Sequence, residues 1–173
     1  MGEVCEAVKG RIIAIDGKAL RGSARTGRGL RALHQVSAYA AEYGLTLGQR
    51  PCQEKSNEIT AIETLLPSLA LAGAVVTIDA IGCQTGIARQ ITEGGGDYVL
   101  AVKDNQPQLA EALRDFFSSL NAPGHCRRAV SSHETLDKGH GRIETRRCQA
   151  VGELDWLELL GLKARWSEIA SVA

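Results

Sequence analysis

The sequence predicts an α/β fold in which helices flank a mixed sheet, with a small strand-rich insertion near the C-terminus. Two short runs of β-branched and apolar residues, bounded by glycine, are typical of buried strands. Each run ends on an aspartate, Asp16 or Asp79. Apolar residues between the runs recur at steps of three and four, which is typical of helices. Beyond residue 121 the pattern changes to polar segments around a glycine-rich turn, which predicts two further strands.

The first predicted elements are a strand and a hairpin. Residues 12–15 form the first apolar run, which Asp16 and Gly17 close. The segments 33–40 and 45–50 partly alternate apolar and polar residues on either side of a glycine, so we expect them to pair as a hairpin. A carboxylate at the end of a buried strand lies at the rim of the sheet, where α/β proteins bind ligands. Asp16 is therefore a candidate functional residue.

A helix and a second buried strand follow. The helix is expected over 57–71, where an asparagine caps its start and Pro67 kinks or splits it. The strand 74–79 repeats the design of the first one and ends on Asp79. Two acids that end separate strands can lie on neighbouring strands and share a metal ion. Asp16 and Asp79 together form the predicted site.

Two helices and a strand complete the predicted core. A helix over 85–93 stops at three consecutive glycines, and residues 98–102 form the next strand. Asn105 is expected to cap the following helix, with Pro107 in its first turn. The apolar face of that helix consists of Leu109, Leu113, Phe116, Phe117 and Leu120. This order of strands and helices is the order of a ribonuclease-H-like fold.

Composition and charge exclude several classes of protein. Hydrophobic residues make up 44% of the 173 residues, enough for one domain with a core. Twenty basic residues balance twenty acidic ones, so the chain lacks a domain-wide basic footprint for nucleic acid. Five scattered cysteines without a CxxC pair are typical of a reduced cytoplasmic protein. No signal peptide or membrane span is recognisable, which predicts a cytoplasmic location and no membrane partner.

Five strings of residues carry a resemblance to a known family. They are IAIDGKALRGS (13–23), EKSNEITAI (54–62), VVTIDAIGCQTGIA (75–88), GGDYVLAVKDNQP (95–107) and HGRIETRR (140–147). In this order and spacing the chain resembles the DDE transposases of insertion sequences, of the H-repeat-associated type, over nearly all of residues 11–151. The resemblance implies a ribonuclease-H-like fold and an enzyme that cuts and joins DNA with divalent metal ions. It also implies insertion-sequence ends as the DNA partner, and self-association of the transposase.

The same resemblance implies that Asp16 and Asp79 are the first two acids of a catalytic DDE triad and ligands of Mg²⁺ or Mn²⁺. Cleavage of this kind uses two divalent ions about 3.5–4 Å apart. The third acid of the family is a glutamate in a helix resembling HWxIENxLHWxLDV, and this sequence holds no such segment. Glu144 belongs to a different family motif and alternates with Arg142 and Arg146. We therefore expect Glu144 to be a solvated, salt-bridging residue rather than the third acid.

The resemblance also predicts how the chain is divided. We expect an incomplete ribonuclease-H-like catalytic core over 11–121, a strand-rich insertion over 122–152 and a truncated tail over 153–173. The resemblance starts just before the first catalytic strand and ends before the C-terminus of the chain. We therefore expect the chain to be a transposase core that is truncated at both ends. Because a second divalent ion loses a ligand when the third acid is missing, we expect weak metal binding and negligible turnover by this chain alone.

A basic segment follows the first strand. It contains no acid and carries Lys18, Arg21, Arg25, Arg28 and Arg31. Clustered arginine and lysine side chains bind DNA phosphates, but a solvated flexible loop explains the glycines of this segment and the neutral net charge equally well. Both interpretations stay open. Lys55 lies in a family motif, and its chemistry alone assigns it no role.

Other interpretations follow from the same residues. Cys126, His133, His140 and Cys148 lack the paired spacing of a zinc site, so we expect no zinc centre. The main alternative function is a non-catalytic DNA-binding or interaction fragment that interferes with full-length transposase. Sequence-selective binding with a steep salt dependence and no nicking would distinguish it. A nuclease that uses an unrecognised third acid would act on RNA–DNA hybrids, and a misfolded product would expose apolar surface.

Overall fold

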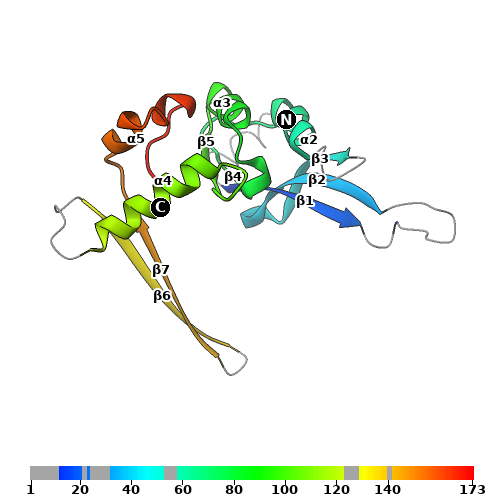
Figure 1. Cartoon of the computed structure of the whole chain (residues 1–173). Helices are drawn as coiled ribbons and strands as arrows, with labels where there is room; N and C mark the ends of the chain where they lie inside the picture. The colour runs from blue at the N-terminus through cyan, green and yellow to red at the C-terminus, as the bar shows by residue number, and fades with distance from the viewer. Residues whose placement is uncertain (1–11, 21–22, 24–31, 53–57, 123–128, 140–141) are drawn as a thin grey trace. The chain divides into compact units, whose positions relative to one another are not determined.

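The computed structural model of the chain (Figure 1) divides into two compact units, Met1–Gln106 and Pro107–Ala173. It describes residues 12–20, 23, 32–52, 58–122, 129–139 and 142–173. No helix within these ranges is long and apolar enough to cross a membrane. The predicted division into a core over 11–121, an insertion and a tail has different boundaries from these two units and stays a prediction.

The first unit is built on a five-stranded sheet with the strand order β3-β2-β1-β4-β5. Its strands are β1 (Ile12–Leu20), β2 (Leu33–Ala40), β3 (Leu45–Cys52), β4 (Val75–Ile78) and β5 (Asp97–Leu100). β2 runs antiparallel to both β1 and β3, whereas β1, β4 and β5 are mutually parallel. The predicted α/β class with a mixed sheet is therefore confirmed, and the carboxyl ends of the three parallel strands meet at one edge.

Helices α2 (Glu58–Leu65) and α3 (Thr85–Glu93) pack against one face of this sheet (Figure 1). The buried core combines Ile13, Ile15, Val36, Ala38, Val76 and Ile78 from the strands with Ile62, Leu65, Ile87 and Ile91 from the helices. Full burial of an isoleucine side chain contributes about 1.5–3 kcal/mol. This apolar layer holds β1 beside β4, and so it also fixes the positions of the residues that follow those strands.

Two predicted features of this unit are confirmed. The expected hairpin is β2 and β3, joined by the 3-10 turn η3 (Ala41–Tyr43) and Gly44. Gly44 has φ of +63°, a left-handed conformation that glycine adopts without the strain of a Cβ atom. The expected split of the helix over 57–71 also occurs, because α2 ends and the 3-10 helix η5 (Leu66–Ser68) follows with Pro67 inside it.

The first strand is longer than the sequence predicted. β1 continues past Gly17 because β2 provides an antiparallel partner for every residue as far as the pair Leu20 and Leu33. Lys18 therefore lies in a strand, and the prediction that placed it in a flexible basic loop was wrong. The other basic residues of that segment, Arg21, Arg25, Arg28 and Arg31, lie outside the described residues.

The second unit contains two helices and a two-stranded antiparallel ribbon. Its elements are α4 (Pro107–Leu120), β6 (Ser131–Gly139), β7 (Arg142–Ala150) and α5 (Asp155–Leu159). The ribbon, formed by β6 and β7, confirms the two predicted polar strands. In the tail, Trp156 stacks on Phe116 at 4.1 Å between ring centres, and Val172 pairs with Val151. These contacts fold the tail back on its own unit.

Candidate functional site

Asp16 and Asp79 occupy equivalent positions on neighbouring parallel strands. Ile15 pairs with Ile78 in the ladder between β1 and β4, and each aspartate is the next residue along the chain. Neighbouring strands lie about 4.8 Å apart. The structure thus brings together the two acids that the sequence singled out, Asp16 in the middle of β1 and Asp79 directly after the end of β4.

Asp79 has a defined local geometry. It is extended, with φ −70° and ψ −178°, and it caps the 3-10 helix η6 (Ala80–Gly82). The backbone N–H of Ile81 donates a hydrogen bond to Oδ1 of Asp79 at 3.2 Å. A carboxylate has about four acceptor positions, so this cap leaves further positions for a ligand. This cap orients the Asp79 carboxylate without occupying all of its acceptor positions.

Asp16 is also exposed and has a charged neighbour on its own strand. The Lys18 ammonium lies 3.5 Å from Oδ2 of Asp16, and the side chains are 73% and 53% exposed. Residues two apart project from the same face of a strand, which explains the contact. An exposed ion pair of this kind contributes about 0–1 kcal/mol. A metal ion can therefore displace Lys18 from the Asp16 carboxylate.

A cavity of about 430 Å³ opens at this edge of the sheet. Its lining comes from one residue within β1, from residues that follow β4 and β5, and from the start of α2. The residues are Gly17, Glu58, Asp79, Ala80, Ile81, Lys103, Asp104 and Asn105. Asp16 adjoins this lining through Gly17. The cavity therefore lies where α/β proteins bind ligands, outside the carboxyl ends of their parallel strands.

Glu58 is the residue of this cavity that sequence reasoning missed. It is the one charged residue that is buried in the described part of the chain, with 6% of its surface exposed. It begins α2, where the helix dipole favours a negative charge. Its Oε1 lies 3.9 Å from Nδ1 of His34 on β2. In the sequence, the one feature that singles out Glu58 is its place in the family string EKSNEITAI. That string gives no indication that Glu58 is buried.

The surroundings of Glu58 are adapted to its carboxylate. A Cβ atom added to Gly17 would lie 2.8 Å from Cδ of Glu58, so the absence of a side chain at Gly17 makes room for the acid. On β3, burial and then the charge of Glu58 raise the pKa of the Cys52 thiol. Glu58 therefore packs against the backbone of Gly17, and its charge contributes to the raised pKa of the Cys52 thiol.

The loop after β5 is tied to the loop after β4 by two side-chain amides. Asn105 donates a hydrogen bond from its amide nitrogen to the carbonyl of Ala80, and Gln106 donates to the carbonyl of Cys83 at 2.9 Å. Asn105 was expected to cap α4, and this prediction was wrong because its side chain bonds to the Asp79 loop instead. These bonds hold Lys103 beside the same cavity as Asp79.

The other predicted residues do not join this site. Glu144 is an exposed residue of β7 whose carboxylate pairs with Nε of Arg146 at 3.0 Å, as expected for a solvated salt bridge. His133 and Cys148 face each other across the ribbon. In the described residues no three histidine, cysteine or acidic side chains are grouped closely enough to hold a metal ion. Lys55, Cys126 and His140 lie outside the described residues.

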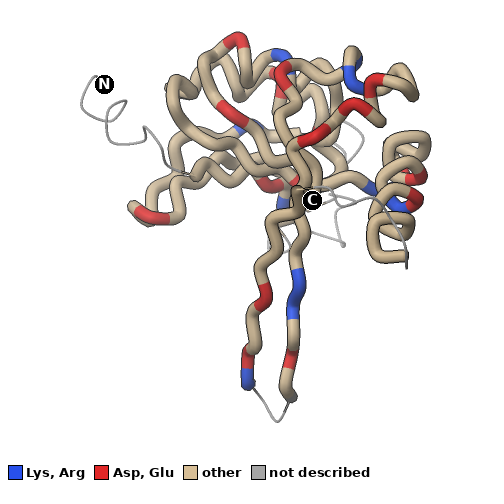
Figure 2. The backbone as a smooth tube through the Cα atoms, turned by 90° about the vertical axis from the view of Figure 1, so that its left-hand side faces the viewer, with Lys and Arg blue, Asp and Glu red and all other residues tan. Residues whose placement is uncertain are grey.

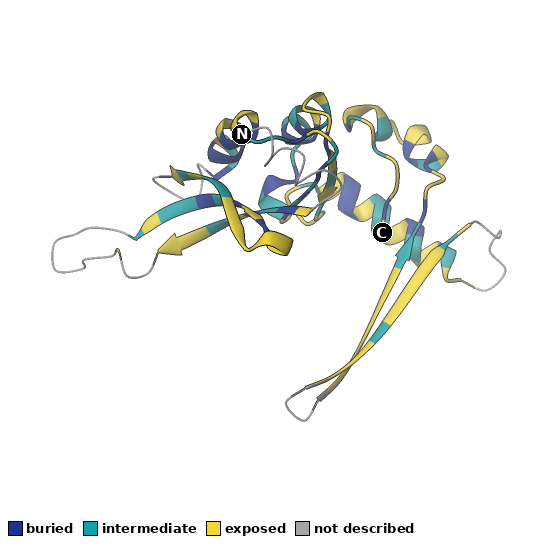
Figure 3. Cartoon of the chain, turned by 180° about the vertical axis from the view of Figure 1, so that it is seen from behind, coloured by how far each residue is buried: buried dark blue, intermediate teal, exposed yellow. Residues whose placement is uncertain are grey.

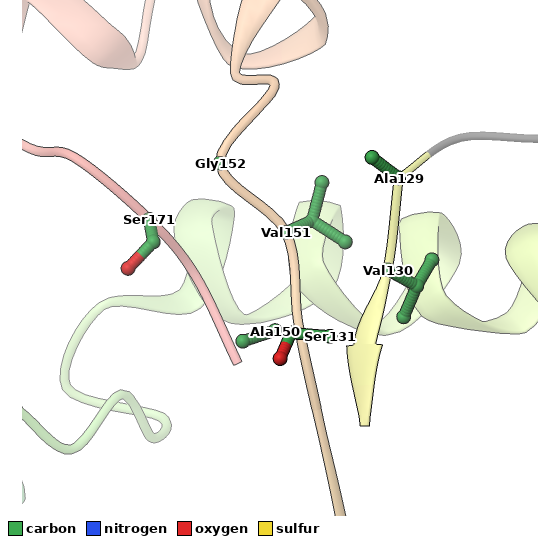
Figure 4. A pocket seen from close by; sticks show the side chains of 7 residues that line it. All are labelled: Ala129, Val130, Ser131, Ala150, Val151, Gly152 and Ser171. Atoms are coloured by element: carbon green, nitrogen blue, oxygen red, sulfur yellow. The ribbon is translucent and has the colours of Figure 1, made fainter.

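The second unit has a cavity of similar size but different chemistry. It also measures about 430 Å³, and Figure 4 shows its lining. The residues are Ala129, Val130, Ser131, Ala150, Val151, Gly152 and Ser171. None of them is acidic, basic, histidine or cysteine. This cavity offers no group for acid–base chemistry or for a metal ion, so the candidate site is the cavity of the first unit.

The donor chemistry of the site suits a hard divalent cation. Asp16 and Asp79 supply carboxylate oxygens, which Mg²⁺ prefers, and this ion completes its octahedral shell largely with water and substrate phosphate. Two carboxylates are therefore sufficient to begin such a site. A soft metal that needs cysteine or histidine ligands does not fit, because neither residue type lines the cavity.

Comparisons with known proteins identify the family. The family model described as "Transposase DDE domain" matches residues 8–156. The chain is 46% identical over 146 residues to "Putative transposase YncI" of Escherichia coli K12, a match that covers 84% of this chain and 58% of that protein. It is 44% identical over 137 residues to "H repeat-associated putative transposase YbfD" of the same strain, covering 78% and 52%.

The relatives are longer than this chain. A protein of Xanthobacter autotrophicus, described as "Uncharacterized protein in dhlA 3'region", is 48% identical over 145 residues, which are 84% of this chain and 48% of that protein. The chain spans between about a third and somewhat more than half of the length of the curated relatives it matches. No solved structure is similar enough to this chain to count as a match.

Proposed function

Because this chain belongs to the family of DDE-domain transposases, we propose that it forms part of the catalytic core of a DNA transposase that acts at insertion-sequence ends. The observation that carries the proposal is the parallel register of β1 and β4, which sets Asp16 beside Asp79. The five-stranded mixed sheet with two helices on one face supports a ribonuclease-H-like fold. The reaction is metal-dependent cleavage of a phosphodiester bond followed by strand transfer.

The residues of the site have separate roles in this proposal. Asp16 and Asp79 hold Mg²⁺ or Mn²⁺ through their carboxylate oxygens. Such ions, when bound, activate the attacking oxygen and stabilise the leaving oxygen of the phosphodiester. The hydrogen bond from Ile81 keeps Asp79 in a fixed orientation. Lys103 lines the cavity beside Asp79, where its ammonium group can contact a DNA phosphate.

The proposal includes a low activity for these 173 residues alone. No segment of the sequence resembles the family motif that carries the third acid, and the described residues offer no group of three metal-binding side chains. Two carboxylates bind a divalent ion more weakly than three. We therefore expect weak cation binding and negligible turnover unless a third acid is supplied, and we expect DNA and other transposase chains to be the partners.

Titration of the purified chain with Mn²⁺, followed by electron paramagnetic resonance, tests the proposal. We expect Asp79→Asn to weaken Mn²⁺ binding about tenfold or more, because the variant loses a charged ligand. Asp97→Asn is the matched control, since Asp97 is an exposed aspartate at the amino end of β5, on the same sheet. Equal affinities of the wild-type chain and Asp79→Asn would overturn the proposal.

A nicking assay on duplex DNA carrying the insertion-sequence end is the second measurement. We expect little product from the wild-type chain and still less from Asp79→Asn, with Mn²⁺ required in both cases. Efficient nicking by the wild-type chain, abolished in Asp79→Asn, would show that two described acids are enough and would contradict the expected low activity. Nicking that persists in Asp79→Asn would contradict the role of the site.

A further inference from the structure

We infer that Glu58 is a third acidic group of the Asp16–Asp79 site, which acts on the hydration shell of the bound cation rather than as a direct ligand. The inference rests on the proposed function, because it requires a divalent cation at Asp79. In this inference Glu58 is a positioning residue. It lies on α2, whereas Asp16 lies in β1 and Asp79 follows β4.

The first reason is the place of Glu58. Its side chain and that of Asp79 line the same cavity, although they come from different elements. Only 6% of Glu58 is exposed, so its carboxylate has little contact with bulk water. Burial of a carboxylate costs several kcal/mol unless a partner compensates it. A cation in the shared cavity is such a partner.

The second reason is that the described surroundings compensate the charge only in part. Among the described residues, His34 forms an ion-pair contact with Glu58, but its Nδ1 lies 3.9 Å from Oε1, which is too far for a hydrogen bond. Within the described part of the chain, no lysine or arginine forms an ion pair with this carboxylate. The helix dipole of α2 contributes about 0.3–1 kcal/mol, which is less than the cost of burial.

The third reason is the contact with Gly17. The Glu58 carboxylate occupies the space where a side chain at Gly17 would be, since a Cβ atom there would lie 2.8 Å from Cδ and from Oε2. Gly17 directly follows Asp16 in β1. Glu58 is therefore packed against β1 on the face of Gly17 and lines the cavity beside Asp79, whereas Asp16 projects from the opposite face of β1.

The role in the hydration shell follows from two facts. The described residues contain no group of three metal-binding side chains, so Glu58 is not placed for direct ligation together with both aspartates. Mg²⁺ keeps several of its waters when it binds to proteins. A carboxylate that faces the same cavity can accept hydrogen bonds from those waters, and outer-shell partners of this kind typically contribute 10–100-fold in metal affinity.

The test compares Mn²⁺ affinities of four variants of the full chain. Glu58→Gln keeps the shape and hydrogen-bonding capacity of the side chain and removes its charge, so we expect an affinity about tenfold weaker with a melting temperature close to that of the wild type. Asp79→Asn should lose at least as much, and Asp97→Asn should match the wild type. His34→Gln removes the neighbouring base and leaves the acid, so its affinity should stay equal or increase.

Each outcome decides between two roles. If Glu58 has a purely structural role, Glu58→Gln and His34→Gln should lower the stability of the chain equally. Both variants should then bind less Mn²⁺ only to the extent that part of each protein is unfolded. If Glu58→Gln binds Mn²⁺ like the wild type while Asp79→Asn does not, the inference fails and the proposed function stands. If neither variant changes the affinity, the proposed function fails. If Glu58→Gln does not fold, the test rests on His34→Gln. We expect His34→Gln to bind Mn²⁺ as tightly as the wild type or more tightly. Weaker Mn²⁺ binding by the folded His34→Gln variant would overturn the inference.

Discussion

Two regions of this chain contain the same local pattern of residues and differ in everything around it. In β1, Ile15 precedes Asp16, and a lysine two positions later pairs with the acid. In β7, Ile143 precedes Glu144, and an arginine two positions later pairs with the acid. Both acids are exposed strand residues with a basic neighbour. Local sequence therefore does not distinguish a functional acid from a surface one.

The difference lies in what the two strands pack against. β1 is a central strand of a five-stranded sheet, has a parallel neighbour that ends on a second aspartate, and adjoins a cavity. β7 has one neighbour, β6, and Figure 3 draws most of this ribbon as exposed. Figure 2 shows acidic and basic residues along both strands of the ribbon. Tertiary register, rather than residue type, sets Asp16 beside a second acid.

The largest expected difference between the two regions is in stability. Ile15 is 3% exposed and Ile143 is 67% exposed. Ile15→Ala should lower the free energy of unfolding by about 2–5 kcal/mol, because it leaves a cavity in the core. Ile143→Ala should change it by no more than about 0.5 kcal/mol. Urea unfolding followed by circular dichroism measures both values, and equal losses would show that the ribbon is as tightly packed as the sheet.

Cysteine reactivity should separate the same regions. Cys83 is buried beside the site, and burial raises the pKa of its thiol to about 11, whereas Cys148 is an exposed residue of the ribbon. At pH 8 the fraction of Cys83 present as the reactive thiolate is then roughly a hundredfold smaller than for an exposed thiol of ordinary pKa. Burial slows the reaction of Cys83 with a reagent further. The thiolate fraction of Cys83 should rise with each pH unit up to about 11.

Labelling with a thiol reagent followed by peptide mapping checks this expectation. Peptide mapping is needed because Cys5 and Cys126 lie outside the described residues. Cys148 should be modified first, and Cys83 should stay unmodified until the chain is unfolded. Modification of both cysteines at one rate in the native chain would show that the Asp79 loop opens freely.

Metal binding should distinguish the two acids themselves. Asp16→Asn is expected to weaken Mn²⁺ binding about tenfold, and Glu144→Gln is expected to leave it unchanged, although both substitutions remove one exposed carboxylate charge. The shared loss of charge makes Glu144→Gln a control for a general electrostatic effect. An equal loss in both variants would mean that Mn²⁺ responds to net charge and not to a site.

Much of the sheet could be predicted from local sequence. The β-branched runs before Asp16 and Asp79 identified β1 and β4 correctly, and the hairpin and the split at Pro67 also followed from short-range patterns. The pairing of β1 with β4 could only be hypothesised. Parallel strands are joined by long connections, so no local signal sets which residue of one strand lies opposite which residue of the other.

The rest depended on contacts between distant residues. β1 passes Gly17 because β2 pairs with it, which overrides the tendency of glycine to end a strand. Glu58 belongs to the cavity because Gly17 leaves space for its carboxylate. Asn105 has a good capping residue type, yet its amide bonds to Ala80 from a distant loop. In each case a tertiary partner decided the role of the residue.

The smallest expected effect concerns the basic neighbours of the two acids. Lys18 lies 3.5 Å from Asp16, so its positive charge opposes a cation at that carboxylate. Two unit charges about 4 Å apart in water interact with about 1 kcal/mol, which corresponds to roughly a fivefold change in binding. Lys18→Ala should therefore tighten Mn²⁺ binding by up to about fivefold at low salt and by less at 0.15 M salt, where exposed charges are screened.

Arg146→Ala is the matched variant on the ribbon, because Arg146 pairs with Glu144 over a similar distance. It should leave Mn²⁺ binding unchanged at any salt concentration, and neither variant should lose more than about 1 kcal/mol of stability, since exposed ion pairs contribute little. Weaker Mn²⁺ binding by Lys18→Ala would mean that Lys18 holds Asp16 in place for the cation rather than competing with it. The ion pair of β1 would then be part of the site, unlike its counterpart in β7.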